Sequence, residues 1–383
     1  MKIPFLNFKV QHDRIREEMR QAFQDVYDSN WYIMGRYLSQ FEKEYAAFND
    51  VKHTVGVSNG LDALYLSLKV LGIGEGDEVI VPSNTYIATA LAVSYTGATP
   101  VFVEPDPRTY NLSPDNLRAA IGLKTKAVIP VHLYGQACEM NEIMLLAQQQ
   151  GLYVVEDNAQ AHGASFQNQM TGSFGHVNAV SFYPGKNLGA LGDAGAVTTN
   201  DALLAEKVSV LRNYGSKVKY NNEVIGHNMR LDELQAAFLS VKLKHLSPFT
   251  EQRRDIAAIY NERLKGLGDL VLPYVHPQAT HVYHLYVIRT AQRDELQHYL
   301  TGKGIGTLIH YPIPPYLQQA YAGLGYKKGD FPIAEELANT SLSIPLWPGM
   351  TAAEAYEVCD VLESFFSGLD GIEYEQESLQ LKQ

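Results

Sequence analysis

The sequence predicts an α/β fold, in which a large domain built on a mostly parallel sheet is followed by a smaller α+β domain. Between residues 51 and 200, short β-branched runs alternate with amphipathic runs of helix length, which is typical of βαβ units. After residue 200 the alternation stops, and long helical runs precede a mixed pattern. The chain of 383 residues also exceeds the roughly 250–300 residues at which a single core stops growing.

The expected strands and helices follow one another in order. Strand-like runs are VKHTVGVS (51–58), EVIVPS (78–83), TPVFVEPD (99–106), TKAVIPVHLYG (125–135) and YVVEDNAQ (153–160). The helical runs between them are DALYLSLKVL, TYIATALAVSYTG, SPDNLRAAIG and MNEIMLLAQQQG, and Gly151 closes the last as a left-handed cap. Two more strand-like runs, VNAVSFYP (177–184) and GAVTTN (195–200), flank a glycine-rich segment.

The remainder predicts helices over 201–213 and 231–262, the second long enough to link two domains. A strand (281–290), a helix (293–304), a Pro-rich loop and two more helices follow. We therefore expect a large domain over residues 1–250 and a smaller α+β domain over residues 251–383. The polar last residues, from about 370, are expected to fray.

Composition excludes several classes of protein. The 31 Lys+Arg and 42 Asp+Glu give a net charge of −11, which argues against a nucleic-acid partner. Cys138 and Cys359 cannot form a disulfide framework, as expected for a cytoplasmic protein. The uncharged tract 79–103 contains prolines and a glycine, so no membrane span is expected. His281 and His284 are the nearest approach to paired metal ligands, and no metal site is predicted.

Lys186 lies in the segment SFYPGKNLGALGDAGA (181–196). By itself, a lysine in a glycine-rich segment is usually solvated. Here an apolar strand runs into the segment, and its glycines allow the backbone to approach a planar ligand. A buried amine in such a place has a lowered pKa and acts as a nucleophile toward carbonyls.

Two further features lie at strand ends. Asp157 ends the strand YVVED, at the sheet edge where ligands bind; it could pair with the ring nitrogen of pyridoxal phosphate (PLP) or simply cap a helix. The segment SNGLDAL (58–64) opens a helix, whose free N–H groups could hold a phosphate, although alone it would more often be an ordinary cap. Together with Lys186 these features favour a PLP pocket.

The chain resembles the DegT/DnrJ/EryC1/StrS sugar aminotransferases, PLP enzymes of the aspartate aminotransferase fold (fold type I). The resemblance extends from about Ile3 to Phe366 through PSNTYIAT, EDNAQAHGA, SFYPGKNLGALGDAGA and GHNMRLDELQAA. The run around Lys186 and the K-Y-x-N motif at 219–222 are most similar to enzymes that aminate C-3 of a nucleotide-linked keto sugar. The TTGEGG-like turn usual in C-4 enzymes is absent.

The resemblance implies roles for cofactor-binding residues. Lys186 would bond to the cofactor and carry the proton to the sugar carbon, and Asp157 would keep the pyridine nitrogen protonated. Asn228 would reach the phosphate of the neighbouring subunit, which implies a homodimer with shared active sites. The other implied contacts are Gln160 to the phenolic oxygen, Tyr86 on the ring face, and the Gly60 and Leu61 N–H groups and Ser181 hydroxyl to the phosphate.

Substrate contacts are also implied. Lys219, Tyr220 and Tyr183 are candidates for the diphosphate of the sugar nucleotide. Each candidate has an equally common structural explanation as a buried or solvated side chain. The substrate implied is a dTDP-linked 3-keto-6-deoxyhexose, with L-glutamate as amino donor. The candidates for the sugar itself are His310 and Tyr311, with His162 near the reacting carbon.

Three alternatives remain. The same chemistry could act at C-4 of a 4-keto sugar. Related sugar 3-dehydratases carry histidine in place of the lysine, whereas Lys186 is present here. A non-catalytic regulatory protein on this fold would be expected to lose the lysine, the aspartate or the phosphate-binding residues, and all are present.

Overall fold

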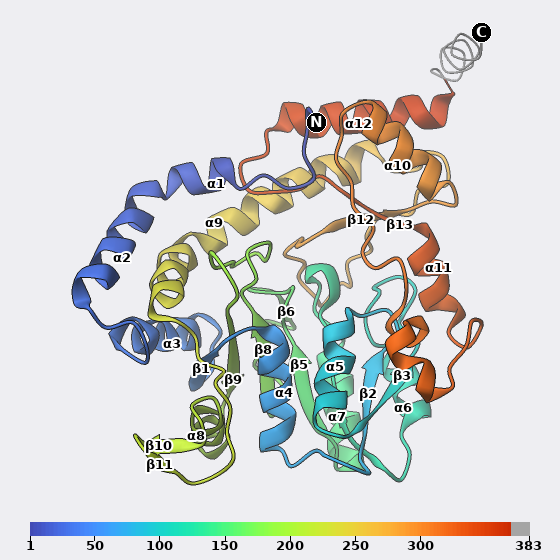
Figure 1. Ribbon diagram of the computed structural model, residues 1–383. Helices are drawn as coiled ribbons and strands as arrows, with labels where there is room; N and C mark the ends of the chain where they lie inside the picture. Colours follow the sequence, from blue (N-terminus) through green and yellow to red (C-terminus); the bar gives the residue numbers. More distant parts are fainter. Residues whose placement is uncertain (369–383) are drawn as a thin grey trace.

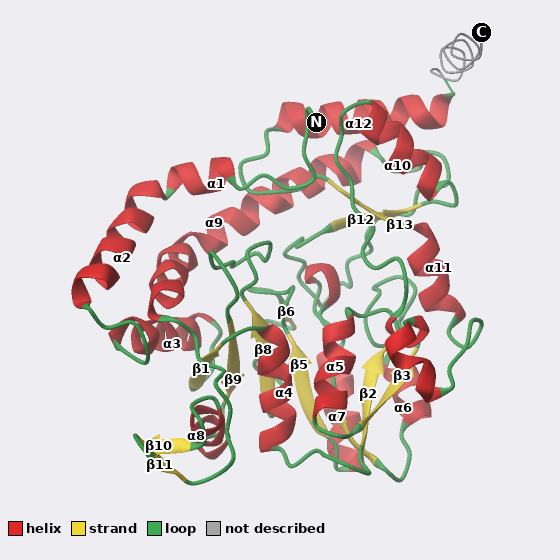
Figure 2. Ribbon diagram, in the orientation of Figure 1, coloured by secondary structure: helices red, strands yellow, loops and turns green. Residues whose placement is uncertain are grey.

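This computed structural model describes residues 1–368. A seven-stranded sheet forms the centre of the large domain (Figure 2). Residues 369–383, including the tail expected to fray, lie outside the described residues. The strand order is β1-β9-β8-β5-β4-β2-β3. The strands are β1 (His53–Val57), β2 (Glu78–Pro82), β3 (Thr99–Val103), β4 (Thr125–Val128), β5 (Tyr153–Asp157), β8 (Val177–Ser181) and β9 (Gly195–Thr199).

The mostly parallel sheet expected from the sequence is confirmed. Strand β9 is antiparallel to both its neighbours, β1 and β8, and the other pairs are parallel. Side chains alternate between the two faces of each strand. In β2, for example, Val79 and Val81 pack into one core and Ile80 into another. Because both faces are covered by helices, the strands are mostly buried, and even their polar residues Glu156, Asp157 and Asn178 lie in the interior.

The helices of the alternating region cover these two faces. One core includes residues of α4 (Gly60–Val70), α5 (Ile87–Tyr95) and α8 (Ala202–Leu211). The opposite core includes residues of α6 (Pro114–Ala120) and α7 (Met140–Gln150). Among residues 1–368, no helix is both long and apolar enough to cross a bilayer.

The long helix α9 (Glu233–Arg263) connects the large domain to the C-terminal part of the chain (Figure 1). Its first half packs with α3 (Arg36–Phe48). None of the three N-terminal helices, which also include α1 (Lys9–Arg14) and α2 (Arg16–Ser29), was predicted from the sequence, and α2 also packs on α9.

The C-terminal part contains an antiparallel pair, β12 (Tyr286–Arg289) and β13 (Ser341–Ile344). Its helices are α10 (Arg293–Gly302), α11 (Pro332–Thr340) and α12 (Ala352–Ser367). Strand β12 is shorter than the predicted 281–290, because the N–H groups of Val282 and Leu285 donate instead to the Gly135 and Tyr134 carbonyls of the large domain. Ile3 pairs with Ile305 and lies in the C-terminal core with Trp347. The domain boundary at residues 250 and 251 stays a prediction.

Short elements complete the description. The hairpins β6–β7 (Ser165–Phe166 and Gln169–Met170) and β10–β11 (Ser216–Val218 and Asn221–Asn222) were not predicted. Short 3₁₀-helices are η1 (Leu133–Gly135), η2 (Pro315–Leu317) and η3 (Gln319–Leu324).

Candidate active site

Two neighbouring strand ends bring Lys186 and Asp157 to the same edge of the sheet. Strand β5 ends at Asp157, which lies opposite Ala179 of the parallel strand β8. Lys186 follows β8 on a tight turn, in which its backbone N–H donates to the Tyr183 carbonyl at 2.8 Å. Parallel strands present their carboxyl ends at one edge, so both groups face the C-terminal part of the chain.

Asp157 is a buried carboxyl group with few partners. It accepts a hydrogen bond from the Thr89 hydroxyl at 3.0 Å and one from the Ala159 N–H at 3.2 Å. Burial raises the pKa of Asp157, and these hydrogen bonds and the charge on Lys186 only partly oppose the shift. A cationic partner at this position would relieve the cost of burying the carboxylate.

Burial lowers the pKa of Lys186 to about 8, and the nearby Asp157 partly opposes the shift. Within residues 1–368 its Nζ has no hydrogen-bond partner. A substantial fraction of the side chain is therefore a neutral amine at slightly alkaline pH, the form that attacks carbonyls.

A cavity of about 280 Å³ opens beside Lys186, between the sheet edge and the C-terminal part. It contains five residues predicted for the site: Gln160, Tyr183, Lys186, His310 and Tyr311. The rest of its lining is Phe5, Leu6, Gly185, Arg253, His284, Leu285, Leu308, Ile344 and Leu346. The cavity therefore combines a mainly apolar wall with a few polar groups, as small-molecule sites do.

Gln160 and Tyr311 hold one another in this cavity. The Gln160 Nε2 donates to the Tyr311 hydroxyl at 2.9 Å, and the Gln160 Oε1 accepts from the Tyr134 N–H at 2.6 Å. The exposed Tyr86 ring lies 5.2 Å from the Tyr311 ring. Both side chains therefore contact Tyr311 of the cavity wall. The contacts of Gln160 and Tyr86 with a cofactor stay predictions.

His310 is anchored by its Nδ1 atom, which lies 2.9 Å from the Ser343 hydroxyl. Burial, with a smaller contribution from Lys186, lowers the pKa of His310 to about 4. The ring is therefore neutral at physiological pH and lies on the cavity wall.

The start of α4 provides an anion site close to Ser181. The N–H groups of Gly60 and Leu61 have no backbone acceptor within residues 1–368, as is normal for the first turn of a helix. A Cβ atom on residue 60 would lie 2.6 Å from the Ser181 Cβ, so only glycine allows this approach. Two free N–H groups and a hydroxyl at a helix N-terminus suit a phosphate.

His162 is fully buried, and it does not line the cavity. Its Nε2 donates to the Ser181 carbonyl at 3.0 Å, and its ring stacks 5.7 Å from Phe182. Burial lowers its pKa to about 3. In this position His162 stabilises the end of β8 through its contacts with Ser181 and Phe182. The substrate contact predicted for His162 stays a prediction, and the burial of the side chain does not favour it.

Three predicted residues lie away from the cavity of their own chain. Lys219 and Tyr220 form the exposed turn of the β10–β11 hairpin, with the Lys219 Nζ 5.2 Å from the Tyr220 ring. Figure 1 shows this hairpin beside α8, at the opposite end of the molecule from β12 and β13. Asn228 is also exposed, and its segment bridges to Asn213. The segment of Asn228 also bridges from Arg230 to Val57, just before the start of α4, whereas Lys219 and Tyr220 remain on the exposed hairpin.

Arg253 and His284 line the cavity and were missed from the sequence. Arg253 is buried on α9, and its Nη1 donates to the carbonyls of Tyr283 and Leu346, both at 3.3 Å. Burial lowers its pKa to about 10, and no carboxylate pairs with it in the described part of the chain. The sequence marked His284 only as a poor metal-ligand pair with His281, and Arg253 lies in no motif.

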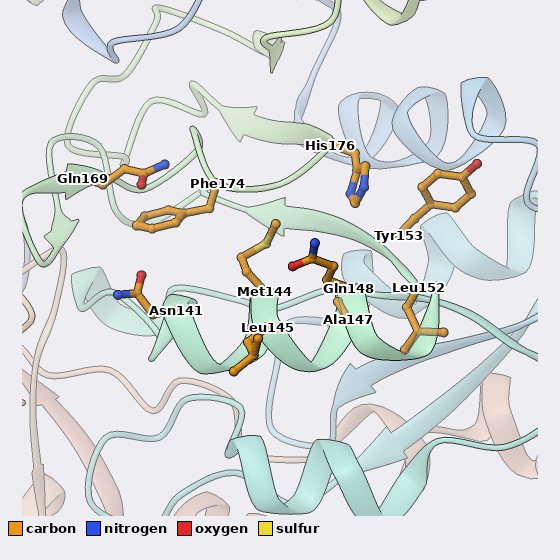
Figure 3. Close-up of a pocket in the computed structure, with 11 residues that line it drawn as sticks. Asn141, Met144, Leu145, Ala147, Gln148, Leu152, Tyr153, Gln169, Phe174 and His176 are labelled. Atoms are coloured by element: carbon orange, nitrogen blue, oxygen red, sulfur yellow. The ribbon is translucent and has the colours of Figure 1, made fainter.

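A larger hollow of about 800 Å³ lies elsewhere, between α7 and the loop around Phe174 (Figure 3). Tyr153 and His176 stand at one end of it and Asn141 at the other. It contains none of the residues predicted for the site. Among residues 1–368, no three histidine, cysteine, aspartate or glutamate side chains are grouped so that they could hold a metal ion.

Comparison with known proteins places the chain in a family. A curated relative, the dTDP-3-amino-3,4,6-trideoxy-α-D-glucose transaminase of Streptomyces venezuelae, is 47% identical over 96% of this chain and 97% of its own length. The dTDP-3-amino-3,6-dideoxy-α-D-galactopyranose transaminase of Aneurinibacillus thermoaerophilus is 49% identical over 95% and 99%. The crystal structure of S. venezuelae DesV in complex with a ketimine intermediate superposes with a TM-score of 0.93, at 47% identity, over 95% of this chain and 98% of that one.

These similarities confirm the aminotransferase fold and the resemblance based on the four motifs. The family model of the DegT/DnrJ/EryC1/StrS aminotransferases matches residues 13–363, almost the whole described chain. The protein therefore belongs to the DegT/DnrJ/EryC1/StrS aminotransferase family.

Proposed function

We propose that this chain is a PLP-dependent aminotransferase that converts a nucleotide-linked 3-keto-6-deoxyhexose to the 3-amino sugar, with L-glutamate as amino donor. The observation that carries the proposal is that Lys186 and Asp157 follow or end neighbouring parallel strands and lie close enough for each to influence the pKa of the other. The two similar transaminases named above form dTDP-linked 3-amino sugars, which favours a dTDP-linked substrate in deoxyamino-sugar biosynthesis.

The residues at the sheet edge fit PLP at both ends of that molecule. The free N–H groups of Gly60 and Leu61, with the Ser181 hydroxyl, suit its phosphate. Asp157 suits its ring nitrogen, because a buried carboxyl without a nearby arginine favours a cationic partner. Lys186 lies in the same neighbourhood as Asp157, since each influences the pKa of the other.

These residues would share the work of transamination. When bound, PLP stabilises the negative charge that develops on the carbon losing or gaining a proton. The neutral amine of Lys186 would bond to the cofactor's carbonyl carbon and, once released, move the proton to or from the reacting carbon. Asp157 would hold a proton on the ring nitrogen, and the buried environment would exclude water.

Arg253 supports a dicarboxylate as the amino donor. Its guanidinium lines the cavity beside Lys186 and lacks a carboxylate partner among residues 1–368. A buried arginine without a counter-ion attracts an anion strongly. One carboxylate of L-glutamate would provide that anion and place the amino group near Lys186.

The decisive experiment is product analysis. We expect the purified protein, loaded with PLP, to convert a dTDP-linked 3-keto-6-deoxyhexose in the presence of L-glutamate, and NMR of the product to find nitrogen on C-3. The imine chemistry is the same at C-3 and C-4, so the carbon is selected by how the sugar is held, to within about an ångström. Nitrogen on C-4, or turnover of 4-keto substrates alone, would contradict the C-3 assignment and establish the alternative.

A regulatory protein without catalysis is the second candidate. It would bind PLP without turning over any keto sugar. The lowered pKa of Lys186 favours a covalent bond to PLP over binding by charge alone, and turnover is the property that separates the two candidates. Absence of turnover with 3-keto and 4-keto sugars alike would favour this candidate.

We also propose that the working unit is a homodimer in the cytoplasm. A row of large apolar side chains is exposed on α2 and the segment after it, as expected for an interface. The tip of the β10–β11 hairpin and its flank add further exposed apolar residues. Phe23, Tyr27, Trp31, Tyr32, Ile33 and Met34 form the first group, and Tyr214, Val218, Tyr220, Val224 and Ile225 the second.

Subunit exchange tests whether Asn228 serves a neighbouring site. Chains carrying Lys186→Ala and chains carrying Asn228→Ala should each be strongly impaired. After random exchange, about a quarter of wild-type activity should return, because half of the dimers then contain one site with both residues intact. The control is each variant exchanged with itself, with mixing verified by mass-tagged chains. Mixed dimers without regained activity would show that Asn228 does not complete a neighbour's site.

A further inference from the structure

The side-chain amide of Asn187 fixes the tautomer of His284. Asn187 is buried directly after Lys186, and its Nδ2 donates to the Val282 carbonyl at 3.1 Å. Its Oδ1 lies 3.2 Å from the Nδ1 of His284. A backbone carbonyl only accepts, so the amide can have only this orientation. The Nδ1 of His284 therefore carries the hydrogen, and its Nε2 is a hydrogen-bond acceptor.

His284 presents this acceptor in the neutral state. Burial, together with the positive charges of Lys186 and Arg253, holds its pKa well below the ordinary value; His310 and His162 add to the shift. His284 lines the cavity, and its Nε2 has no hydrogen-bond partner within the described residues.

No other polar group of the cavity has an acceptor fixed in this way: His310 is also neutral, but the Ser343 hydroxyl at its Nδ1 can donate or accept and so does not set its tautomer. Lys186 when charged and Arg253 can only donate hydrogen bonds, while the amide of Gln160 already bonds to Tyr311 and Tyr134. The His284 Nε2 is thus suited to a hydroxyl group of the substrate. Because the nucleotide on C-1 must remain toward solvent, ring carbons distant from C-1 would enter the cavity, and among the neighbours of C-3 that carbon is C-4.

We propose that the His284 Nε2 accepts a hydrogen bond from the C-4 hydroxyl of the sugar and thereby selects sugars that retain this hydroxyl. The inference rests on the proposed function. The names of the two similar transaminases show that sugars in this family differ at this position: one is 3,4,6-trideoxy and the other 3,6-dideoxy. A site with an acceptor for a hydroxyl disfavours the analogue that lacks it, because the buried acceptor is then left unpaired.

Two substitutions of His284 separate its role as an acceptor for the sugar hydroxyl from its hydrogen bond to Asn187. In His284→Asn, the side-chain NH₂ takes the place of Nδ1 and keeps the bond to Asn187, but the acceptor in the cavity is lost. In His284→Gln, the longer amide reaches the position of Nε2 and restores an acceptor there. The probes are the dTDP-linked 3-amino-3,6-dideoxyhexose and its 3,4,6-trideoxy counterpart, and calorimetry gives the ratio of their Kd values.

We expect the wild-type chain to bind the 4-hydroxy sugar about tenfold more tightly. This ratio should persist in His284→Gln and fall to near one in His284→Asn, with thermal unfolding verifying that both variants fold. A wild-type ratio near one, or a ratio that survives in His284→Asn, would overturn the inference while leaving the proposed function intact. Binding of neither sugar by the wild type would overturn both.

Discussion

Replacing Lys186 with alanine is expected to abolish transamination, with a loss of at least about 10⁴-fold in kcat. The cavity offers no substitute, because its other cationic group, Arg253, remains protonated and is held by two carbonyls. His162 and His310 lack the ability to form the covalent bond of a primary amine. Single-turnover assays with L-glutamate and with the keto sugar would measure the loss in each half of the reaction.

The same variant should still bind PLP through Asp157 and the phosphate site. The cofactor should therefore co-purify with Lys186→Ala, but dialysis should remove it and the visible absorption should resemble that of free PLP. Lys265→Ala is the matched control, since Lys265 is exposed just beyond α9 and should leave both spectrum and rate unchanged. Turnover by Lys186→Ala above a hundredth of the wild-type rate would remove Lys186 from its proposed role.

The second large effect is expected for Asp157→Asn, with a loss of about 10²–10⁴-fold in kcat. An amide has the shape of the carboxyl group and can still accept from Thr89, but it carries no charge to keep the ring nitrogen protonated. Steady-state kinetics at saturating PLP would measure this loss separately from weaker cofactor binding.

The stability of the Asp157→Asn variant should not fall together with its rate. Burial raises the pKa of Asp157 in the folded chain above its unfolded value. Stability is therefore lost as the pH rises from the unfolded-state pKa to the folded-state pKa, and the full cost of the charge applies above both. Asp157→Asn removes that charge, and without PLP its Tm at neutral pH should equal or exceed that of the wild type.

A residue that merely capped a helix would behave differently. Asp201 is such a cap: its Oδ1 accepts from the N–H groups of Leu203 and Leu204 at 2.8 and 3.2 Å. Asparagine caps about as well as aspartate, so Asp201→Asn should change neither rate nor Tm. If Asp157→Asn matched this control in both measurements, Asp157 would have no role in catalysis.

Much of the large domain could be predicted because its signals are local. Each run of β-branched residues between amphipathic helices became a strand of the sheet. The ends of α8 and α9 lie within two residues of the helices predicted over 201–213 and 231–262. Parallel strands end at one edge of a sheet. The sequence therefore sufficed to bring Asp157, at the end of β5, near Lys186, just after β8.

Predictions were weaker where a segment's partner lies far away in the sequence. The strand expected over 281–290 is short because Val282 and Leu285 bond to the turn at 134–135, so that packing overrides local preference there. The N-terminal helices were also not predicted, although α2 and α3 are amphipathic, and both pack against α9.

The sequence by itself determined the α/β class, the order of the strands along the chain, the family, and the lysine and aspartate that carry the proposed chemistry. Only the tertiary structure decided which other side chains surround them. It brought Arg253 from the middle of α9 and His284 from beyond it to the cavity wall, buried His162, and left Lys219 and Tyr220 on a distant hairpin. The physical reason is that hydrophobic periodicity fixes which face of an element is buried, whereas a cavity is formed by side chains from segments that meet only when the whole chain packs.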